Sequence, residues 1–168
     1  MLIVSVAAYS GHLPLSDSFA WLGTSSALIM LGVAAIVEIL AYYIPGVDNL
    51  LDTLATPAAF VAGTVVSAAV MTDVPPMVKW TAAVIAGGGL AGVTQGVAAT
   101  LRANSTAWTG GLGNFIIATA ELVGALVVSF LALAAPAAAI ALVLLFLWLA
   151  IRLLRWLLRG AHPSTRET

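Results

Sequence analysis

The chain has 168 residues, of which 62% are hydrophobic and 8% are charged, and its formal net charge is -1. Soluble domains carry about 25% charged residues, so too few charged side chains are available here to cover a water-soluble fold, and the composition predicts an integral membrane protein. The small net charge argues against nucleic acid as a partner, and the absence of cysteine excludes disulfides and thiolate metal sites.

The first element is too short to span a membrane. About ten residues precede Gly11, whereas a spanning helix needs about 20 apolar residues. We expect an interfacial stub or the remnant of a longer first helix. The next segment, LPLSDSFAWLG, carries Phe19 and Trp21 and is expected to lie along the outer interface.

Five longer apolar runs follow, and each is predicted to form a spanning helix. They cover residues 25–44, 56–71, 77–101, 114–135 and 136–158. Pro45-Gly46 is expected to end the first, Thr56-Pro57 to begin the second, and Pro136 to separate the last two, because one helix across Pro136 would be about twice as long as a bilayer is thick. The fold class is therefore all-α: a polytopic bundle of five full spans and an N-terminal partial helix over residues 1–159, with a short polar tail over residues 160–168.

Basic residues predict the orientation of the bundle. A cluster of arginines beside two tryptophans at the end of the last helix is typical of a cytoplasmic anchor: Arg152, Arg155, Arg159, Trp148 and Trp156. Counting spans backwards places the loops 46–55 and 102–113 inside and the segments 11–24 and 75–76 outside. The C-terminus is therefore expected in the cytoplasm.

Three glycines at four-residue spacing, Gly88, Gly92 and Gly96, are predicted to line one face of the third helix. Small residues on one face allow a neighbouring helix to approach closely. Plain tight packing is the simpler interpretation, and the thin wall of a substrate path is the alternative.

Two carboxylates, Glu38 and Glu121, lie well inside apolar runs. Such residues usually face the bundle interior and mark an ion or proton path, because a charge at that depth costs several kcal/mol. The predicted topology puts both in the cytoplasmic half, where repulsion between them would favour a shared proton. The structural alternative has Glu38 bonded to Tyr42 or Gln95, and Glu121 as a protonated packing residue.

Most other polar groups fall in two predicted loops, IPGVDNLLDTLATP and LRANSTAWTGGLGN, or beside them. Helix breakers next to polar side chains are typical of a cavity lined by broken helix ends. The residues expected to shape this cytoplasmic mouth are Asp48, Asn49, Asp52, Arg102, Asn104 and Asn114. Gln95, near the cytoplasmic end of the third helix, is expected to bind the ion, proton or substrate with them. Alternatively, Asp48 and Asn49 are ordinary turn and cap residues.

The sequence does not predict an enzyme. It contains no Ser/His/Asp order, no glycine-rich phosphate loop followed by lysine, and no His/Glu metal spacing on one helix. No cofactor is expected.

Three stretches, VEILAYYIPGVDNLLDTLATPAAFVAGTVVSAAV, IAGGGLAGVTQG and STAWTGGLGNFIIATAEL, resemble the bacterial membrane family catalogued as domain of unknown function 4126. The resemblance covers residues 13–159 and implies no activity. Family members share Glu38, Pro45, Asp48, Gly63, Gly113, Asn114 and Glu121. This chain departs from many members in having Tyr42-Tyr43 for Asp-Lys and Phe115 for proline.

Family members usually begin with a full first helix, which implies that this chain starts late. Restoring that helix would give six spans and a candidate inverted 3+3 repeat, with each glutamate in the middle helix of its half. The leading hypothesis is a small transporter or channel-like homo-oligomer in the lipid of a bacterial inner membrane, with Glu38 and Glu121 binding a cation, proton or small solute. The alternative is a non-transporting membrane protein that binds lipid or a protein partner.

Overall fold

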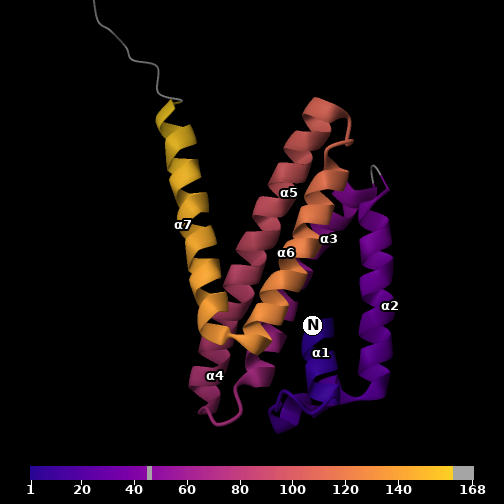
Figure 1. Cartoon of the computed structure of the whole chain (residues 1–168), viewed down its shortest axis with the longest axis vertical. Helices are drawn as coiled ribbons and strands as arrows, with labels where there is room; N and C mark the ends of the chain where they lie inside the picture. The colour runs from indigo at the N-terminus through magenta and orange to yellow at the C-terminus, as the bar shows by residue number, and fades with distance from the viewer. Residues whose placement is uncertain (45–46, 161–168) are drawn as a thin grey trace, which may run out of the picture. The chain divides into compact units, whose positions relative to one another are not determined.

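A computed structural model describes residues 1–44 and 47–160, which form helices joined by short turns (Figure 1). The chain folds as two compact units, Met1–Ala120 and Glu121–Thr168. The helical segments are α1 (Leu2–Tyr9), the 3-10 helix η1 (Asp17–Gly23), α2 (Ser25–Tyr42), α3 (Val47–Val70), α4 (Pro76–Ala82), the π-helix η2 (Ala83–Gly88), α5 (Gly89–Thr109), α6 (Asn114–Ala134) and α7 (Pro136–Gly160). The all-α prediction is confirmed for the described residues.

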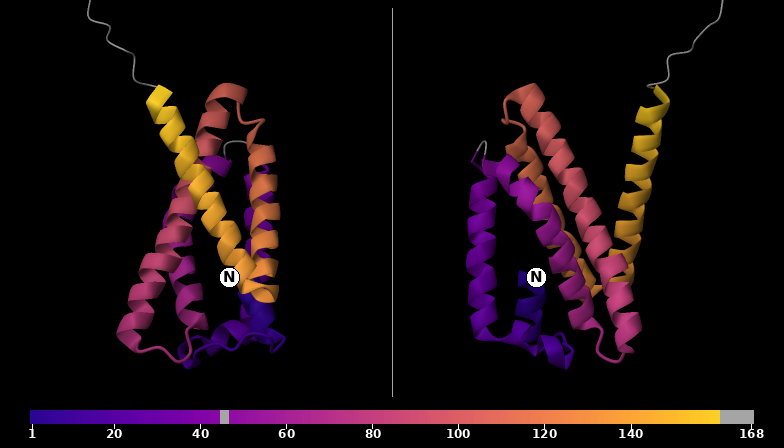
Figure 2. Two further views of the ribbon diagram at one scale, coloured as in Figure 1. Left: turned by 60° about the vertical axis from the view of Figure 1, so that its left-hand side comes forward. Right: turned by 180° about the vertical axis from the view of Figure 1, so that it is seen from behind.

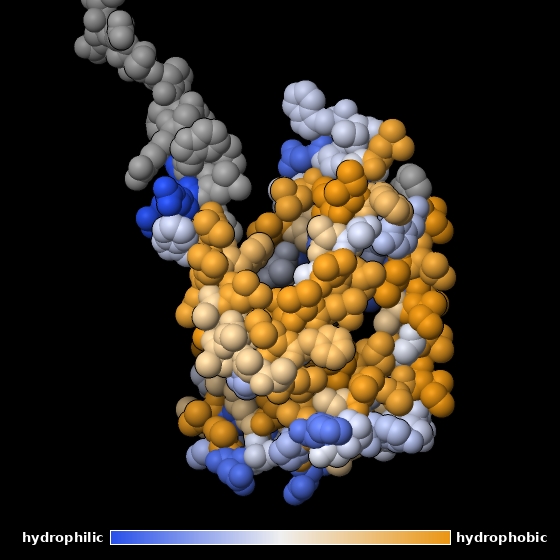
Figure 3. All heavy atoms as spheres, viewed as in Figure 1, coloured by the Kyte–Doolittle hydropathy of each residue, from blue (hydrophilic) through white to orange (hydrophobic). Residues whose placement is uncertain are grey.

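Four of the described helices are long and apolar enough to cross a membrane, which agrees with a multi-pass protein. They cover Ser25–Tyr42, Leu50–Val70, Pro76–Thr109 and Asn114–Ala134. Large apolar side chains are exposed along them and appear as orange spheres in Figure 3, as expected where lipid replaces water. Among the described residues these four helices match four of the five predicted spans, and the described apolar part of α7 covers Pro136–Leu149, so the fifth span stays a prediction. The inverted repeat stays a prediction.

Two predicted helix boundaries are wrong, and in both cases the predicted helix is shorter than the observed one. The helix predicted to begin at Thr56 begins at Val47 and contains Pro57 in its interior. The helix predicted to end at Leu101 continues to Thr109. The predicted loops 46–55 and 102–113 are therefore helical over most of their length. Pro45, Gly46 and residues 161–168, including most of the predicted polar tail, lie outside the described residues.

In the extra turns of α5, polar side chains bond to backbone carbonyl oxygens of their own helix and so leave no competing polar group unbonded there. Thr106 Oγ1 donates to the carbonyl oxygen of Arg102 (2.9 Å), and Asn104 Nδ2 donates to that of Thr100 (2.8 Å). The helix ends at Gly110 and Gly111, whose φ angles of 63° and 92° lie in the left-handed region that favours glycine. These two glycines turn the chain into α6.

Helices α3 and η2–α5 pack side by side (Figure 2), and their backbones approach most closely at glycines. A Cβ atom added at Gly63 would meet the carbonyl oxygen of Gly87 and, at 2.6 Å, the Cβ of Ala91. A Cβ added at Gly87 would meet Ser67 Oγ and, at 2.5 Å, the carbonyl oxygen of Gly63. The two helices can approach this closely only because these positions lack side chains.

The glycine face predicted at Gly88, Gly92 and Gly96 takes part in this close contact at its first member, Gly88. A Cβ at Gly88 would meet Thr64 Oγ1, and one at Gly92 would lie in ordinary contact with Phe60 at 3.7 Å. Apart from its chain neighbours and the backbone of its own helix, no described heavy atom lies within 4 Å of a Cβ at Gly96. The close contact is therefore made by the π-helical segment, which ends at Gly88 and in which one helix turn is wider than usual.

The segment before α2 closes one end of the first unit. Phe19 and Leu22 belong to a buried cluster with residues of α3 and η2, whereas Trp21 is 47% exposed. Lys79 Nζ donates to Ser16 Oγ (2.7 Å) and lies 5.4 Å from the ring centroid of Phe19. The predicted interfacial stretch is thus a 3-10 helix with Phe19 inside and Trp21 outside.

Thr24 caps the N-terminus of α2, because its hydroxyl oxygen accepts a hydrogen bond from the backbone N–H of Ala27 at 3.2 Å. Replacing Thr24 with alanine leaves that donor without a side-chain partner and is expected to lower the free energy of unfolding by about 1 kcal/mol. Denaturant unfolding of the detergent-solubilised protein measures this change. Thr100→Ala is the control, since the Thr100 hydroxyl bonds only within the same helix. Equal effects of the two substitutions would contradict the capping role.

Candidate functional site

The centre of the site is a buried ion pair between α3 and α5. The side chain of Arg102 has no exposed surface, and that of Asp52 is 8% exposed. Arg102 Nε donates to Asp52 Oδ2 at 2.9 Å, and Arg102 Nη2 donates to Asp52 Oδ1 at 2.5 Å. This two-point geometry is the strongest form of an arginine–carboxylate pair. It also compensates part of the cost of removing both charges from water.

Two further side chains complete the polar environment of the ion pair. The guanidinium carbon of Arg102 lies 4.6 Å from the ring centroid of Tyr42, at the end of α2. Gln95 Nε2 lies 3.4 Å from Asp52 Oδ1 and 3.5 Å from the Tyr42 hydroxyl. The ion pair therefore joins three helices, α2, α3 and α5.

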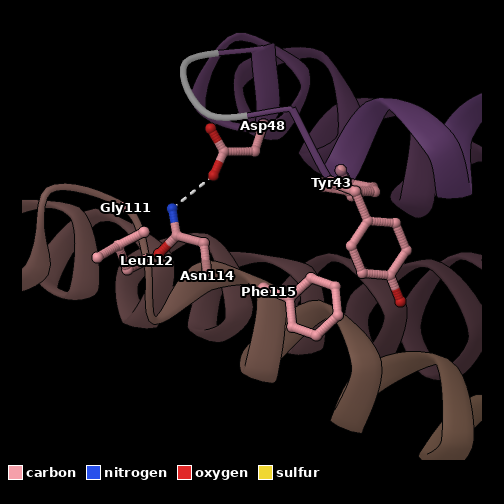
Figure 4. Close-up of a pocket in the computed structure, with 7 residues that line it drawn as sticks. Tyr43, Asp48, Gly111, Leu112, Asn114 and Phe115 are labelled. Carbon is pink, nitrogen blue, oxygen red and sulfur yellow. Dashed lines mark hydrogen bonds between the residues drawn. The ribbon is translucent and has the colours of Figure 1, made fainter.

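A second buried pair connects the first turn of α3 with the first turn of α6. Asn114 Nδ2 donates to Asp48 Oδ2 at 2.5 Å and to Thr106 Oγ1 at 2.8 Å (Figure 4). Asp48 and Asn114 are 1% and 2% exposed. Asn114 Oδ1 is buried and has no hydrogen-bond partner among the described residues. Since Thr106 in turn bonds to the backbone of Arg102, the two pairs form one polar cluster.

Beside the second pair lies a pocket of about 330 Å³, between the end of α2, the start of α3 and the α5–α6 turn. Its walls combine the Asp48–Asn114 pair with aromatic and apolar groups (Figure 4). The ring centroids of Tyr43 and Phe115 are 4.8 Å apart, and the Tyr43 hydroxyl lies 3.1 Å from Thr119 Oγ1. The lining residues are Tyr42, Tyr43, Asp48, Gly111, Leu112, Asn114 and Phe115.

Five of the predicted site residues come together in this cluster, and three of them, Asp48, Asp52 and Arg102, lie on helices and not in the predicted loops. The five are Asp48, Asp52, Gln95, Arg102 and Asn114. Asn104 does not join them: it is exposed, and its side chain bonds to Thr100 on its own helix. Two residues after Arg102, a side chain points to the opposite side of an α-helix. The side chain of Asn49 lies outside the part of the chain that the structure describes.

The proposed pairing of Glu38 with Glu121 stays a prediction, because the two residues belong to different units. Glu38 is exposed on α2, in the midst of apolar residues such as Ile36 and Val37, each 60% exposed. Glu121 is half-buried on α6. Gln95, a suggested partner of Glu38, lies instead within bonding distance of Tyr42 and Asp52.

Sequence reasoning did not assign Tyr42 and Thr106 to the site. A helical periodicity would have found Thr106, because Gln95, Arg102 and Thr106 are spaced by seven and four residues and share one face of α5. Asp48 and Asp52, four residues apart, share a face of α3 in the same way. The signal was present, but it was hidden by the interpretation of both segments as loops.

The family described as Domain of unknown function (DUF4126) matches residues 1–156 of this chain. No curated protein and no solved structure matches it.

Proposed function

The chain belongs to the DUF4126 family, and we propose that it is a small transporter or channel-like protein that moves a cation or proton across a bacterial inner membrane. The observation that carries this proposal is the buried polar cluster at one end of helices that can cross a membrane. Buried ion pairs rarely add stability over well-packed apolar side chains. In membrane helices, such groups commonly mark a path for ions or protons.

The position of the cluster supports a role as the mouth of a path. It lies at the ends of α2 and α5 and at the starts of α3 and α6, beside the pocket. Glu38 lies one helical turn before Tyr42 on α2, farther from this end of the helix. We assign Glu38 and Glu121 as the deeper carboxylates of the path, beyond the mouth.

Orientation and assembly belong to the same proposal. Arg152 lies 5.2 Å from the ring of Trp148, an arrangement common at the cytoplasmic interface of a membrane helix. A cytoplasmic C-terminus would make the cluster the cytoplasmic mouth. A homo-oligomer would cover part of the exposed apolar surface of the helices.

Flux measurements on the purified protein in lipid vesicles test this proposal. With the wild-type chain, an imposed proton or monovalent cation gradient is expected to dissipate faster than in empty vesicles. Glu38→Gln and Glu121→Gln are each expected to reduce that rate by at least about tenfold, a change of about 1.4 kcal/mol in the barrier, because they remove the charge and keep the shape. Asn104→Ala, outside the cluster, is expected to keep the wild-type rate.

A second candidate function rests on Glu38. A carboxylate exposed among apolar residues on α2 also suits a protein that binds a lipid or a protein partner without transporting a solute. In that case an imposed gradient would dissipate no faster in vesicles that contain the wild-type protein than in empty vesicles. Glu38→Gln would then change partner or lipid retention during purification and leave the flux at background.

A further inference from the structure

We propose that one face of α7 binds the phosphate groups of anionic phospholipids, so that the protein holds acidic lipids beside this helix in preference to zwitterionic ones. This basic face consists of Trp148, Arg152, Arg155 and Arg159 (α7 in Figure 1). Arg159 is assigned to the face by its position in the helix alone. The proposal goes beyond transport, since it concerns the lipid around α7 and not the polar cluster. Charge, spacing and unused hydrogen-bond donors support it.

Positive charge is concentrated near the C-terminal end of the chain. Four of the six basic residues lie within residues 152–166, and residues 122–166 contain no aspartate or glutamate. Arg152 and Arg155 are exposed, and neither has an ion pair or a side-chain hydrogen bond with another described residue. The described part of the protein therefore does not compensate these two charges, and an anion in the surroundings is left to balance them.

The spacing of the arginines gathers their charges on one side of the helix. Arg152, Arg155 and Arg159 are separated by three and four residues, and Trp148 lies four residues before Arg152. Residues three and four apart are neighbours on a helix surface. The rise of 1.5 Å per residue makes the distance from Arg152 to Arg159 along the axis about 10 Å. The three positive charges thus form a short stripe and not a ring around α7.

Apolar side chains flank this stripe and indicate what covers it. Leu149 and Ile151, each about 100° around the helix from the neighbouring residue of the basic face, are exposed. A membrane surface suits both kinds of side chain, because its phosphate groups can meet the arginines while its acyl chains meet the apolar flanks. Trp148 is also exposed, and tryptophan is enriched at this boundary. A nucleic acid would leave the flanks in water, so membrane lipid is the occupant.

The contact between Arg152 and Trp148 leaves the guanidinium able to bind a phosphate. Its carbon lies 5.2 Å from the ring centroid. An aromatic ring attracts the charge of a guanidinium but supplies no oxygen acceptor for its five N–H donors. A phosphate can accept two parallel bonds from those donors. Zwitterionic lipids also carry a phosphate, but their ammonium group cancels its charge, so a lipid with a net negative charge is favoured.

Electron spin resonance of the full chain in phosphatidylcholine vesicles tests the proposal, with spin-labelled phosphatidylglycerol and spin-labelled phosphatidylcholine as separate probes. The spectra measure how strongly each lipid associates with the protein. One arginine near an anionic surface contributes about a fivefold gain, so phosphatidylglycerol is expected to associate at least about threefold more strongly. Added salt is expected to reduce this preference, because it screens the attraction between arginine and phosphate.

A double variant locates the preference on α7. Arg152→Gln combined with Arg155→Gln keeps polar side chains and removes two charges, and it is expected to reduce the preference for phosphatidylglycerol to below about twofold. Lys79→Gln is the control, because it removes a positive charge on α4. It is expected to keep the wild-type preference.

The wild-type comparison of the two lipids needs no variant. Equal association of both would overturn the proposal. A full preference in the double variant, or an equal loss in Lys79→Gln, would place the lipid site away from α7 and overturn it too. Inorganic phosphate is expected not to compete, and displacement of phosphatidylglycerol by it would assign the arginines to a soluble anion instead of a membrane lipid. None of these outcomes depends on flux.

Discussion

Replacing Arg102 with methionine is expected to lower the free energy of unfolding by about 3–5 kcal/mol. Methionine has a similar length and is apolar, so the substitution removes the N–H donors of Arg102 and leaves the Asp52 carboxylate buried without its cationic partner. It also removes the contact between the guanidinium and the ring of Tyr42. Denaturant unfolding of the protein in detergent micelles measures the loss.

A second substitution separates the cost of an unpaired charge from a general packing defect. In Arg102→Met combined with Asp52→Leu, no charge remains unpaired, and most of the stability lost in the single variant is expected to return. Asn104→Ala, on the same helix but exposed, is expected to change the stability by no more than about 0.5 kcal/mol. If Arg102→Met unfolded at the same denaturant midpoint as the wild type, the ion pair would not stabilise the bundle.

The polar cluster consists of two parts with different roles. Arg102 and Asp52 satisfy each other at two points, so this pair serves to hold α3 and α5 together. Asp48 and Asn114 line a pocket, and the side-chain oxygen of Asn114 has no hydrogen-bond partner among the described residues. Thr106 connects the two parts, since it accepts from Asn114 and donates to the backbone of Arg102. The ion pair therefore links α3 to α5, and the Asp48–Asn114 pair links α3 to α6 beside the pocket.

Composition and apolar run length were sufficient to predict the all-α class, the helices long and apolar enough to cross a membrane, and most helix positions. They failed where polar residues continue a helix. The segment VDNLLDTLAT is rich in residues that favour turns in isolation, yet Asp48 and Asp52 find buried partners on α6 and α5 and the segment is helical. Tertiary hydrogen bonds therefore decided the boundary, and these bonds are not visible in local propensity.

The residues that form the site were easier to predict than the way in which they pair. Buried polar residues in an apolar chain are few, so selecting Asp48, Asp52, Gln95, Arg102 and Asn114 required only their chemistry. Their pairing could not be predicted, because it depends on which faces of α3 and α5 meet. Those faces are set by the close approach at Gly63 and Gly87, which the predicted glycine face did not include.

Gly87→Ala is expected to destabilise the protein by about 1–3 kcal/mol, because the added methyl group would overlap Ser67 Oγ and the carbonyl oxygen of Gly63. The matched control is Gly96→Ala on the same continuous helix. Apart from its chain neighbours and its own helix backbone, no described heavy atom lies within 4 Å of the added methyl group. Alanine is favoured over glycine inside a helix, so this variant is expected to be more stable by about 0.5–1 kcal/mol. The two substitutions should therefore have opposite signs.

A second substitution, on α3, tests which atoms the methyl group added at Gly87 would overlap. Ser67→Ala removes the hydroxyl that the new methyl group would meet, but the carbonyl oxygen of Gly63, 2.5 Å from that position, remains. The double variant Gly87→Ala with Ser67→Ala is therefore expected to recover only part of the lost stability, as measured by denaturant unfolding in detergent. If Gly87→Ala were as stable as Gly96→Ala, α3 and α5 would have room to separate, and the pairing of Asp52 with Arg102 could not depend on their close contact.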